Sequence, residues 1–182
     1  NSFIYTLLVD PVTGDPLVLD PDKELLLCRS GQNKYSLIKG VPVIFKPGRE
    51  PGSKTPLHSE HGTSFRYRSH YQADAEMFDY SEGTVSASCK HEFKRLRQYI
   101  AKVTGKKYRT ILDVGCGKGW AAETFLPSGR RIISMDISTR NPMAELREHP
   151  HPSHDRLVAD VYNIPLKKDS IDCIIASQVV EH

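Results

Sequence analysis

Residues 111 to 120 read Ile111-Leu112-Asp113-Val114-Gly115-Cys116-Gly117-Lys118-Gly119-Trp120. An apolar strand that ends in an acid is followed by glycines at alternate positions and then by a helical segment. This order of strand, loop and helix brings the backbone close to a ligand at the carboxyl edge of a parallel sheet. We therefore expect a ligand-binding loop here, with the candidate residues Asp113, Gly115, Cys116, Gly117 and Gly119.

The next two predicted strands also lead into acids. The first is followed by Asp136 and Ile137, and an acid at this position can accept hydrogen bonds from both hydroxyls of a ribose. The second is followed by Asp160 and Val161. Because carboxylates repel phosphates, acids at successive strand ends favour a nucleoside-containing ligand over a pyrophosphate.

A fourth predicted strand, at residues 171–176, brings Ser177 and Gln178 to the same edge. The candidate acids also have structural alternatives, because Asp136 could cap a helix and Asp160 could be a turn acid. For the glycine loop the rival is a dinucleotide site, although its Gly-x-Gly-x-Gly spacing departs from Gly-x-Gly-x-x-Gly.

The segments around these motifs alternate between strand and helix. Apolar residues at Phe93, Leu96, Ile100 and Val103 have the spacing of one helical face and predict a helix over 90–103. Beyond it the pattern predicts strands at 110–114, 131–135, 156–159 and 171–176, with helices at 118–126 and 141–149. This alternation predicts an α/β fold with a doubly wound, Rossmann-like parallel sheet that is incomplete, with about four strands.

With four motifs in this order, residues 110–182 resemble the first half of a class I S-adenosylmethionine-dependent methyltransferase. The resemblance implies that S-adenosylmethionine is the cofactor and that the glycine loop surrounds its methionine portion. It further implies contacts from Asp136 and Ile137 at the ribose, from Asp160 and Val161 at the adenine, and from Ser177 beside the sulfonium and the acceptor.

The N-terminal part of the chain has a different pattern. Short apolar runs broken by turn formers predict a small β-rich domain at 1–48, and residues 49–69 have the composition of a linker before the cofactor-binding half at 70–182. Residues 7–45 resemble the zinc-ribbon-like domain that partners tRNA and protein methyltransferases. One cysteine cannot hold a tetrahedral zinc, so we expect no metal at the four matching positions, which are Asp10, Thr13, Cys28 and Gly31.

Composition excludes several classes of protein. The 182 residues include 25 Lys or Arg and 22 Asp or Glu, and the net charge of +3 is too small to indicate a nucleic-acid binder. A basic band at residues 90–131 could face nucleic acid, with a solvated helix surface as the alternative. The apolar runs are far shorter than the roughly 20 residues that cross a bilayer, and no signal peptide is evident. With four widely spaced cysteines, this pattern predicts a cytoplasmic protein without a membrane partner.

We also expect a fragment, because the chain begins without Met and stops just after an apolar strand. That strand would be a free edge through which copies could associate. The leading hypothesis is a methyltransferase of unidentified acceptor and unidentified catalytic base, with this fragment inactive alone. The alternatives are a catalytically inactive cofactor-binding or partner-platform module and, third, an oxidoreductase.

Overall fold

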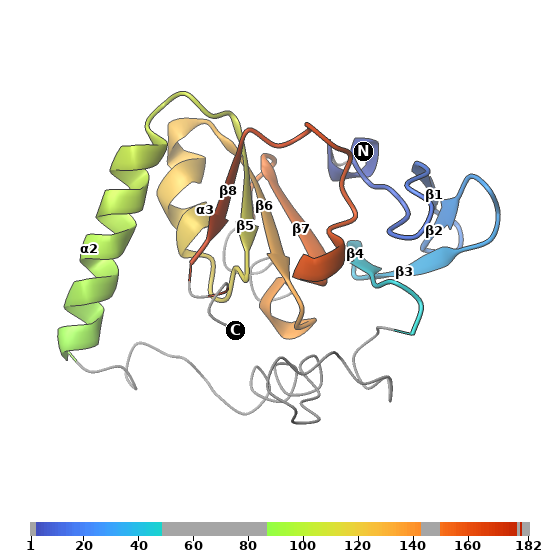
Figure 1. Cartoon of the computed structure of the whole chain (residues 1–182), viewed down its shortest axis with the longest axis horizontal. Helices are drawn as coiled ribbons and strands as arrows, with labels where there is room; N and C mark the ends of the chain where they lie inside the picture. The colour runs from blue at the N-terminus through green and yellow to red at the C-terminus, as the bar shows by residue number, and fades with distance from the viewer. Residues whose placement is uncertain (1–2, 49–86, 143–149, 178, 180–182) are drawn as a thin grey trace.

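The computed structural model describes residues 3–48, 87–142, 150–177 and 179. The predicted linker at 49–69, most of the predicted helix at 141–149, and Gln178 lie outside the described residues. The elements are η1 (Phe3–Thr6), β1 (Leu17–Asp20), β2 (Leu25–Cys28), β3 (Lys34–Ile38), β4 (Val41–Ile44), α2 (Ala87–Thr104), β5 (Thr110–Val114), α3 (Trp120–Phe125), η3 (Leu126–Ser128), β6 (Arg131–Asp136), β7 (His154–Ala159), η4 (Val161–Asn163) and β8 (Cys173–Ala176) (Figure 1).

Four of the strands form the predicted parallel sheet. Strand β5 pairs in parallel with β6 on one side and β8 on the other, and β6 pairs in parallel with β7. Residues of β6 and β7 are buried almost throughout, as expected for parallel strands that are covered on both faces. Across the sheet the strands lie in the order β7-β6-β5-β8, so the chain order of neighbouring strands falls from β7 to β5 and then rises again at β8. This is the strand order of a Rossmann-like sheet, and ligands bind such sheets at the carboxyl edge beside the reversal.

The expected number of about four strands is wrong for the sheet as a whole, which has eight strands among the described residues. Strands β1 to β4 form an antiparallel meander, and β4 then pairs in parallel with β7, with Val43 opposite Val158 and Ile44 opposite Ala159. The N-terminal strands therefore continue the parallel sheet, as Figure 1 shows. The pairing supplies β7 with a backbone partner that the strand would otherwise lack on that side.

The N-terminal segment also packs on one face of the parallel sheet. Its buried side chains, among them Ile4, Leu8 and Leu26, belong to the same apolar cluster as Leu112 and Ile133. The other face of the sheet is covered by α3, whose Ala121, Ala122 and Phe125 pack with Ile111, Ile132 and Ile175. The N-terminal segment thus occupies a position that a second layer of helices could otherwise fill.

Two short contacts attach the N-terminal segment to the chain just before β8. The backbone N–H of Val9 donates to the carbonyl of Pro165 over 3.0 Å, and that of Lys167 donates to the carbonyl of Leu7 over 2.9 Å. Residues 3–6, which the apolar pattern did not separate from a strand, form the 3-10 helix η1. The backbone of Leu7 and Val9 is therefore bonded to a part of the chain that is distant in sequence.

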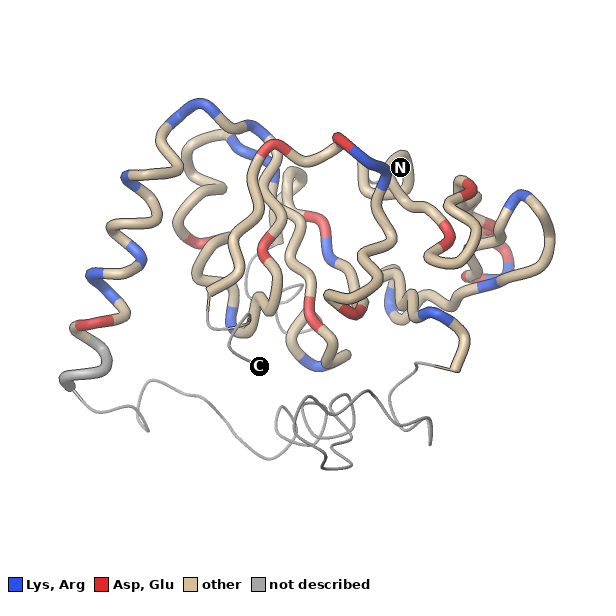
Figure 2. The backbone as a smooth tube through the Cα atoms, in the orientation of Figure 1, with Lys and Arg blue, Asp and Glu red and all other residues tan. Residues whose placement is uncertain are grey.

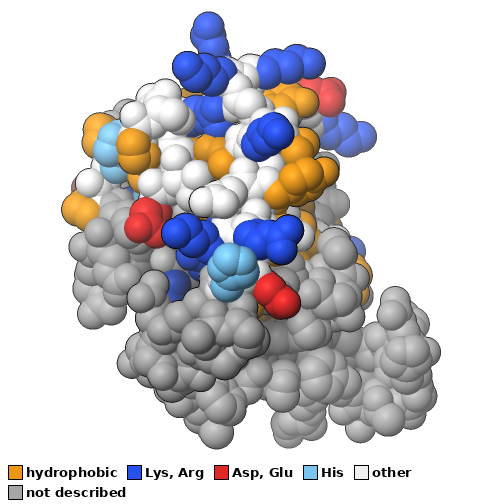
Figure 3. All heavy atoms as spheres, turned by 90° about the vertical axis from the view of Figure 1, so that its left-hand side faces the viewer, with side chains coloured by type: hydrophobic (Ala, Val, Ile, Leu, Met, Phe, Trp, Pro, Cys, Tyr) orange, Lys and Arg blue, Asp and Glu red, His pale blue; other side chains and the backbone are white. Residues whose placement is uncertain are grey.

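Helix α2 confirms the helix predicted for this region, but its apolar face is only partly covered. Phe93 and Ile100 are half-buried, whereas Leu96, Tyr99 and Val103 are exposed. Figure 3 shows apolar and basic side chains together on this side of the molecule, and Figure 2 shows Lys and Arg along α2 and the turn after it. Within the part of the chain that the structure describes, no helix combines the length and apolar character needed to cross a bilayer.

Candidate functional site

The candidate site lies at the carboxyl edge of the parallel strands. Asp113 is the second-last residue of β5, Asp136 is the last residue of β6, and Asp160 follows β7 directly. Because these strands are parallel and adjacent, the structure brings the three predicted acids to one edge of the sheet. The segment after β4 leaves at the same edge, since β4 runs parallel to β7.

The loop after β5 has the backbone that its glycines predict. Gly115, Gly117 and Gly119 all have positive φ, at 64°, 52° and 77°. This left-handed region is costly for residues with a Cβ, so the alternating glycines allow a tight path that other residues would strain. Buried Cys116 fixes the loop to the neighbouring strand, because its backbone N–H donates to the carbonyl of Met135 over 3.0 Å.

Asp136 is the side chain that holds this loop in place. Its Oδ2 accepts hydrogen bonds from the backbone N–H of Gly117 at 3.2 Å and from Nδ2 of Asn141 at 3.0 Å. Its Oδ1 accepts from the backbone N–H of Ser138 at 2.9 Å. Burial raises the pKa of Asp136, and the hydrogen bonds from Ser138, Asn141 and Gly117 oppose that rise. The sequence did not point to Asn141 as a partner, because a residue five positions along the chain has no fixed local relation to an acid.

Asp113 has a different environment from Asp136. Its side chain is 1% exposed, and its Oδ2 has no hydrogen-bond partner among the described residues. The residues opposite it on the two neighbouring strands, Ser134 and Ile175, carry no charge. Burial, with a smaller contribution from the charge of Asp136, raises the pKa of Asp113 to about 7. The site therefore contains one carboxyl group that is well supplied with donors and one that is not.

The remaining predicted residues lie near this edge with structural contacts of their own. Asp160 is buried and caps η4, since its Oδ1 accepts from the backbone N–H of Tyr162 over 3.0 Å. This is the turn role named above as its alternative. Val161 is half-buried against the main apolar cluster, Ile137 packs against the cluster of Val41, Phe45 and Val158, and Ser177 is half-buried directly after β8.

Val179, which follows β8, lies against the start of the glycine loop. A Cβ built on Gly115 would come within 2.5 Å of Cγ2 of Val179, so the two segments are in close contact at this point. This contact sits at the reversal between β5 and β8, where the fold favours a ligand. Glycine at position 115 is therefore required by space as well as by its φ angle.

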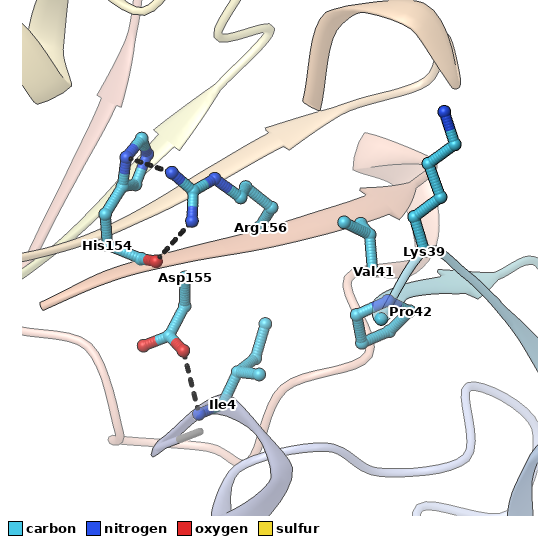
Figure 4. Close-up of a pocket in the computed structure, with 8 residues that line it drawn as sticks. Ile4, Lys39, Val41, Pro42, His154, Asp155 and Arg156 are labelled. Atoms are coloured by element: carbon cyan, nitrogen blue, oxygen red, sulfur yellow. Dashed lines mark hydrogen bonds between the residues drawn. The ribbon is translucent and has the colours of Figure 1, made fainter. Parts of the chain in front are cut away.

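A pocket at the opposite edge of the sheet is a separate feature (Figure 4). It lies at the start of β4 and β7 and is lined in part by Lys39, Val41 and Arg156. Some of its polar side chains bond to neighbouring protein groups: Arg156 donates to the carbonyl of His154 over 2.9 Å, and Asp155 accepts from the N–H of Ile4 over 3.4 Å. The pocket contains none of the residues predicted from the sequence as ligand contacts.

The positions that match zinc ligands form a hydrogen-bonded cluster. Asp10 accepts from the backbone N–H groups of Val12 and Thr13 and from Nδ2 of Asn33, at 2.7, 3.0 and 2.9 Å. The Sγ of Cys28 lies 3.6 Å from Oγ1 of Thr13. Across the described ranges, no three His, Cys, Asp or Glu side chains are grouped in a way that could hold a metal ion.

Comparison with known proteins places the candidate site within a recognised domain. Residues 112–182 match a family model described as a methyltransferase domain. An uncharacterized methyltransferase of Mycobacteroides abscessus is 32% identical over 123 residues, which cover 66% of this chain and 45% of the relative. A ubiquinone biosynthesis O-methyltransferase of Rhodopseudomonas palustris is 30% identical over 100 residues, which cover 53% of this chain and 37% of the relative. A probable S-adenosylmethionine-dependent methyltransferase of Mycolicibacterium smegmatis is 31% identical over 74 residues, which cover 41% of this chain and 28% of the relative.

The matched regions are partial on both sides. The chain spans less than half the length of each of these three relatives. The family match begins at Leu112 and therefore includes the glycine loop and all three acids of the sheet edge.

Proposed function

We propose that the protein is an S-adenosylmethionine-dependent methyltransferase. The observation that carries this proposal is the glycine loop after β5, which has three glycines of positive φ and is bonded through Gly117 to Asp136 at the end of the next strand. The loop lies at the strand-order reversal of a Rossmann-like sheet and within the part of the chain that matches a methyltransferase domain. The proposal leaves the methyl acceptor open.

The residues at this edge suit the chemistry of the cofactor. S-adenosylmethionine, when bound, supplies a methyl group on a positively charged sulfur, and it also carries an ammonium group. The buried Oδ2 of Asp113, without a donor among the described residues, is a group that a cationic ligand would satisfy. The glycines allow the backbone of residues 115–119 to approach the methionine portion closely.

We assign the remaining contacts residue by residue. Asp136, with Ile137, would bind the ribose, Asp160 and Val161 the adenine, and Ser177 would border the acceptor. A carboxylate has about four lone-pair positions, so the donors already on Asp136 leave it little spare capacity. The ribose hydroxyls would therefore share Asp136 with, or replace, the amide of Asn141 or the N–H of Gly117.

The protein's own part in methyl transfer is orientation and exclusion of water. The loop and Asp136 would fix the nucleoside, and Val179 would border the site beside Gly115. An oxygen nucleophile is the first class of acceptor to test, because the Rhodopseudomonas palustris relative is named an O-methyltransferase. We propose that the N-terminal segment acts as a metal-free scaffold for this sheet.

Titration calorimetry with S-adenosylmethionine, S-adenosylhomocysteine and NAD tests the cofactor. We expect the first two to bind and Asp136→Ala to weaken that binding by about 1–3 kcal/mol, the range for a lost charged hydrogen-bonding partner. Asp172→Asn is the matched control, because Asp172 also accepts two backbone N–H bonds but lies at the start of β8, away from the loop. Binding of NAD alone would favour an oxidoreductase instead.

Radiolabelled methyl transfer to a fractionated cell extract tests catalysis separately. We expect label to appear in at least one fraction when the full-length protein is supplied. Cofactor binding without transfer to any fraction would favour a catalytically inactive binding module.

A further inference from the structure

The two carboxyl groups of Asp113 and Asp136 lie at adjacent strand ends but receive very different support. Asp136 is bonded to the backbone N–H groups of Gly117 and Ser138 and to the amide of Asn141. Asp113 is at least as deeply buried, and its Oδ2 has no donor among the described residues. Local dipoles therefore stabilise a negative charge on Asp136, whereas Oδ2 of Asp113 receives no such donor among the described residues.

The charged groups around Asp113 do not offset its burial. On β6 it faces Ser134 and on β8 it faces Ile175, neither of which is charged. Among the described residues, the charge that acts on it is that of Asp136, which raises its pKa further. Two buried carboxyl groups that repel each other hold a proton more readily than either would alone.

We infer that Asp113 holds a proton in the ligand-free protein and releases it to solvent when S-adenosylmethionine binds, so that cofactor binding is coupled to proton release. This inference rests on the proposed function. The cofactor brings positive charge to an edge where no cation of the described residues lowers the pKa of Asp113, and that charge stabilises the carboxylate. The proton leaves the carboxyl oxygen of Asp113, and no bond of the cofactor is made or broken in this step.

Coupling of this kind gives binding a defined dependence on pH. The number of protons released equals the slope of log affinity against pH. With the pKa of Asp113 at about 7 in the free protein, release approaches one proton near pH 6 and falls toward zero above about pH 8. The affinity for S-adenosylmethionine should therefore rise by up to roughly tenfold per pH unit below pH 7 and then level off.

Titration calorimetry in phosphate and in Tris at the same pH measures the released protons directly, because the two buffers differ in ionisation enthalpy. For the unmodified protein at about pH 6.5, we expect the observed binding enthalpy to differ between the two buffers, with the sign that release of a proton to the buffer produces. Asp113→Asn should bind with no difference between the buffers. Asp172→Asn, a matched loss of a carboxyl group whose pKa is lowered by the N–H groups of Thr110 and Arg109, should release as many protons as the unmodified protein.

The outcomes separate this inference from the proposed function. If neither S-adenosylmethionine nor S-adenosylhomocysteine binds, the proposed function fails. If they bind to the unmodified protein with the same enthalpy in both buffers, the function stands and the proton inference is overturned, without recourse to any variant. Release that persists in Asp113→Asn would place the proton on another group and would also overturn it.

Discussion

Gly115 and Val179 are so close that a Cβ on the glycine would lie 2.5 Å from Cγ2 of the valine. The two residues follow β5 and β8, the neighbouring strands between which the sheet reverses its order. Real Cβ atoms do not approach other atoms this closely, so the glycine loop and the segment after β8 each limit where the other can lie. A change at either residue should therefore alter the loop that we propose binds the cofactor.

Replacement of Gly115 by alanine tests this contact. We expect Gly115→Ala to lower the free energy of unfolding by about 2–4 kcal/mol, through a positive φ and a clash, and to abolish measurable cofactor binding. Gly129→Ala is the matched control, because Gly129 has φ 79° and nothing within 4 Å of its Cβ position. Gly129→Ala should lower the free energy of unfolding by only roughly 1–2 kcal/mol, from backbone strain alone, and should leave the cofactor affinity unchanged. Equal losses in the two variants, measured by urea denaturation and calorimetry, would contradict the clash.

The amide of Asn141 supports Asp136 without forming part of the glycine loop. Asn141→Ala removes its 3.0 Å hydrogen bond and should weaken cofactor binding by about 1 kcal/mol, because Asp136 then holds Gly117 less firmly. Asn33→Ala removes the equivalent bond to buried Asp10, of 2.9 Å, far from the loop. It should lower the melting temperature without a change in affinity. If both variants bind the cofactor as the unmodified protein does, Asn141 has no part in the site.

The pH dependence of stability reports on Asp113. Its pKa is about 7 in the folded protein, compared with 3.8 for an ordinary aspartate. Between pH 3.8 and pH 7 the native state therefore holds a proton that the unfolded state has lost. The stability contributed by this group is thus complete below about pH 4 and is lost as pH rises toward 7. Asp113→Asn should remove this fall in stability. At pH 8 its free energy of unfolding should exceed that of the unmodified protein by a few kcal/mol, at about 1.4 kcal/mol per pKa unit. If the free energy of unfolding changes with pH in the same way in the unmodified protein and in Asp113→Asn, Asp113 is not the group responsible.

Asp155 of β7 forms an ion pair with Arg131 of β6 and also bonds the N-terminal segment to the sheet. The two side chains are 3.1 Å apart, and Asp155 also accepts from the N–H of Ile4. Asp155→Asn should lower the free energy of unfolding by about 1–3 kcal/mol, because it weakens a partly buried ion pair and one buried hydrogen bond. Asp20→Asn breaks the exposed pair with Lys23 and should leave stability unchanged within measurement. Neither variant should alter cofactor affinity, and a loss of affinity in Asp155→Asn would contradict a purely structural role.

The sequence predicted the parallel strands and the glycine loop well, because their signals are local. The predicted strand at 110–114 matches β5 residue for residue, and alternating glycines correspond directly to three positive φ angles. The three acids also reach one edge of the sheet as predicted, because parallel adjacent strands end together.

Features that depend on contacts between distant residues were not predictable from the pattern. The pairing of β4 with β7 joins Val43 to Val158, and no local sequence signal specifies a partner so far along the chain. The support of Asp136 by Asn141, and the lack of a donor to Oδ2 of Asp113 within the described ranges, also depend on packing around each side chain. On α2, the apolar spacing predicted the helix correctly but did not show which residues its neighbours would cover.

The parallel pairing of β4 with β7 also has a consequence for the order of folding. The β1 to β4 meander is built from neighbouring segments, so its turns can close early. Its pairing with the parallel sheet must wait until β7 has been synthesised, because α2, β5, α3, η3 and β6 all lie between β4 and β7 in the chain. Closing so long a loop costs entropy before any contact repays it. The pairing of β4 with β7 would then form later in folding than the meander itself.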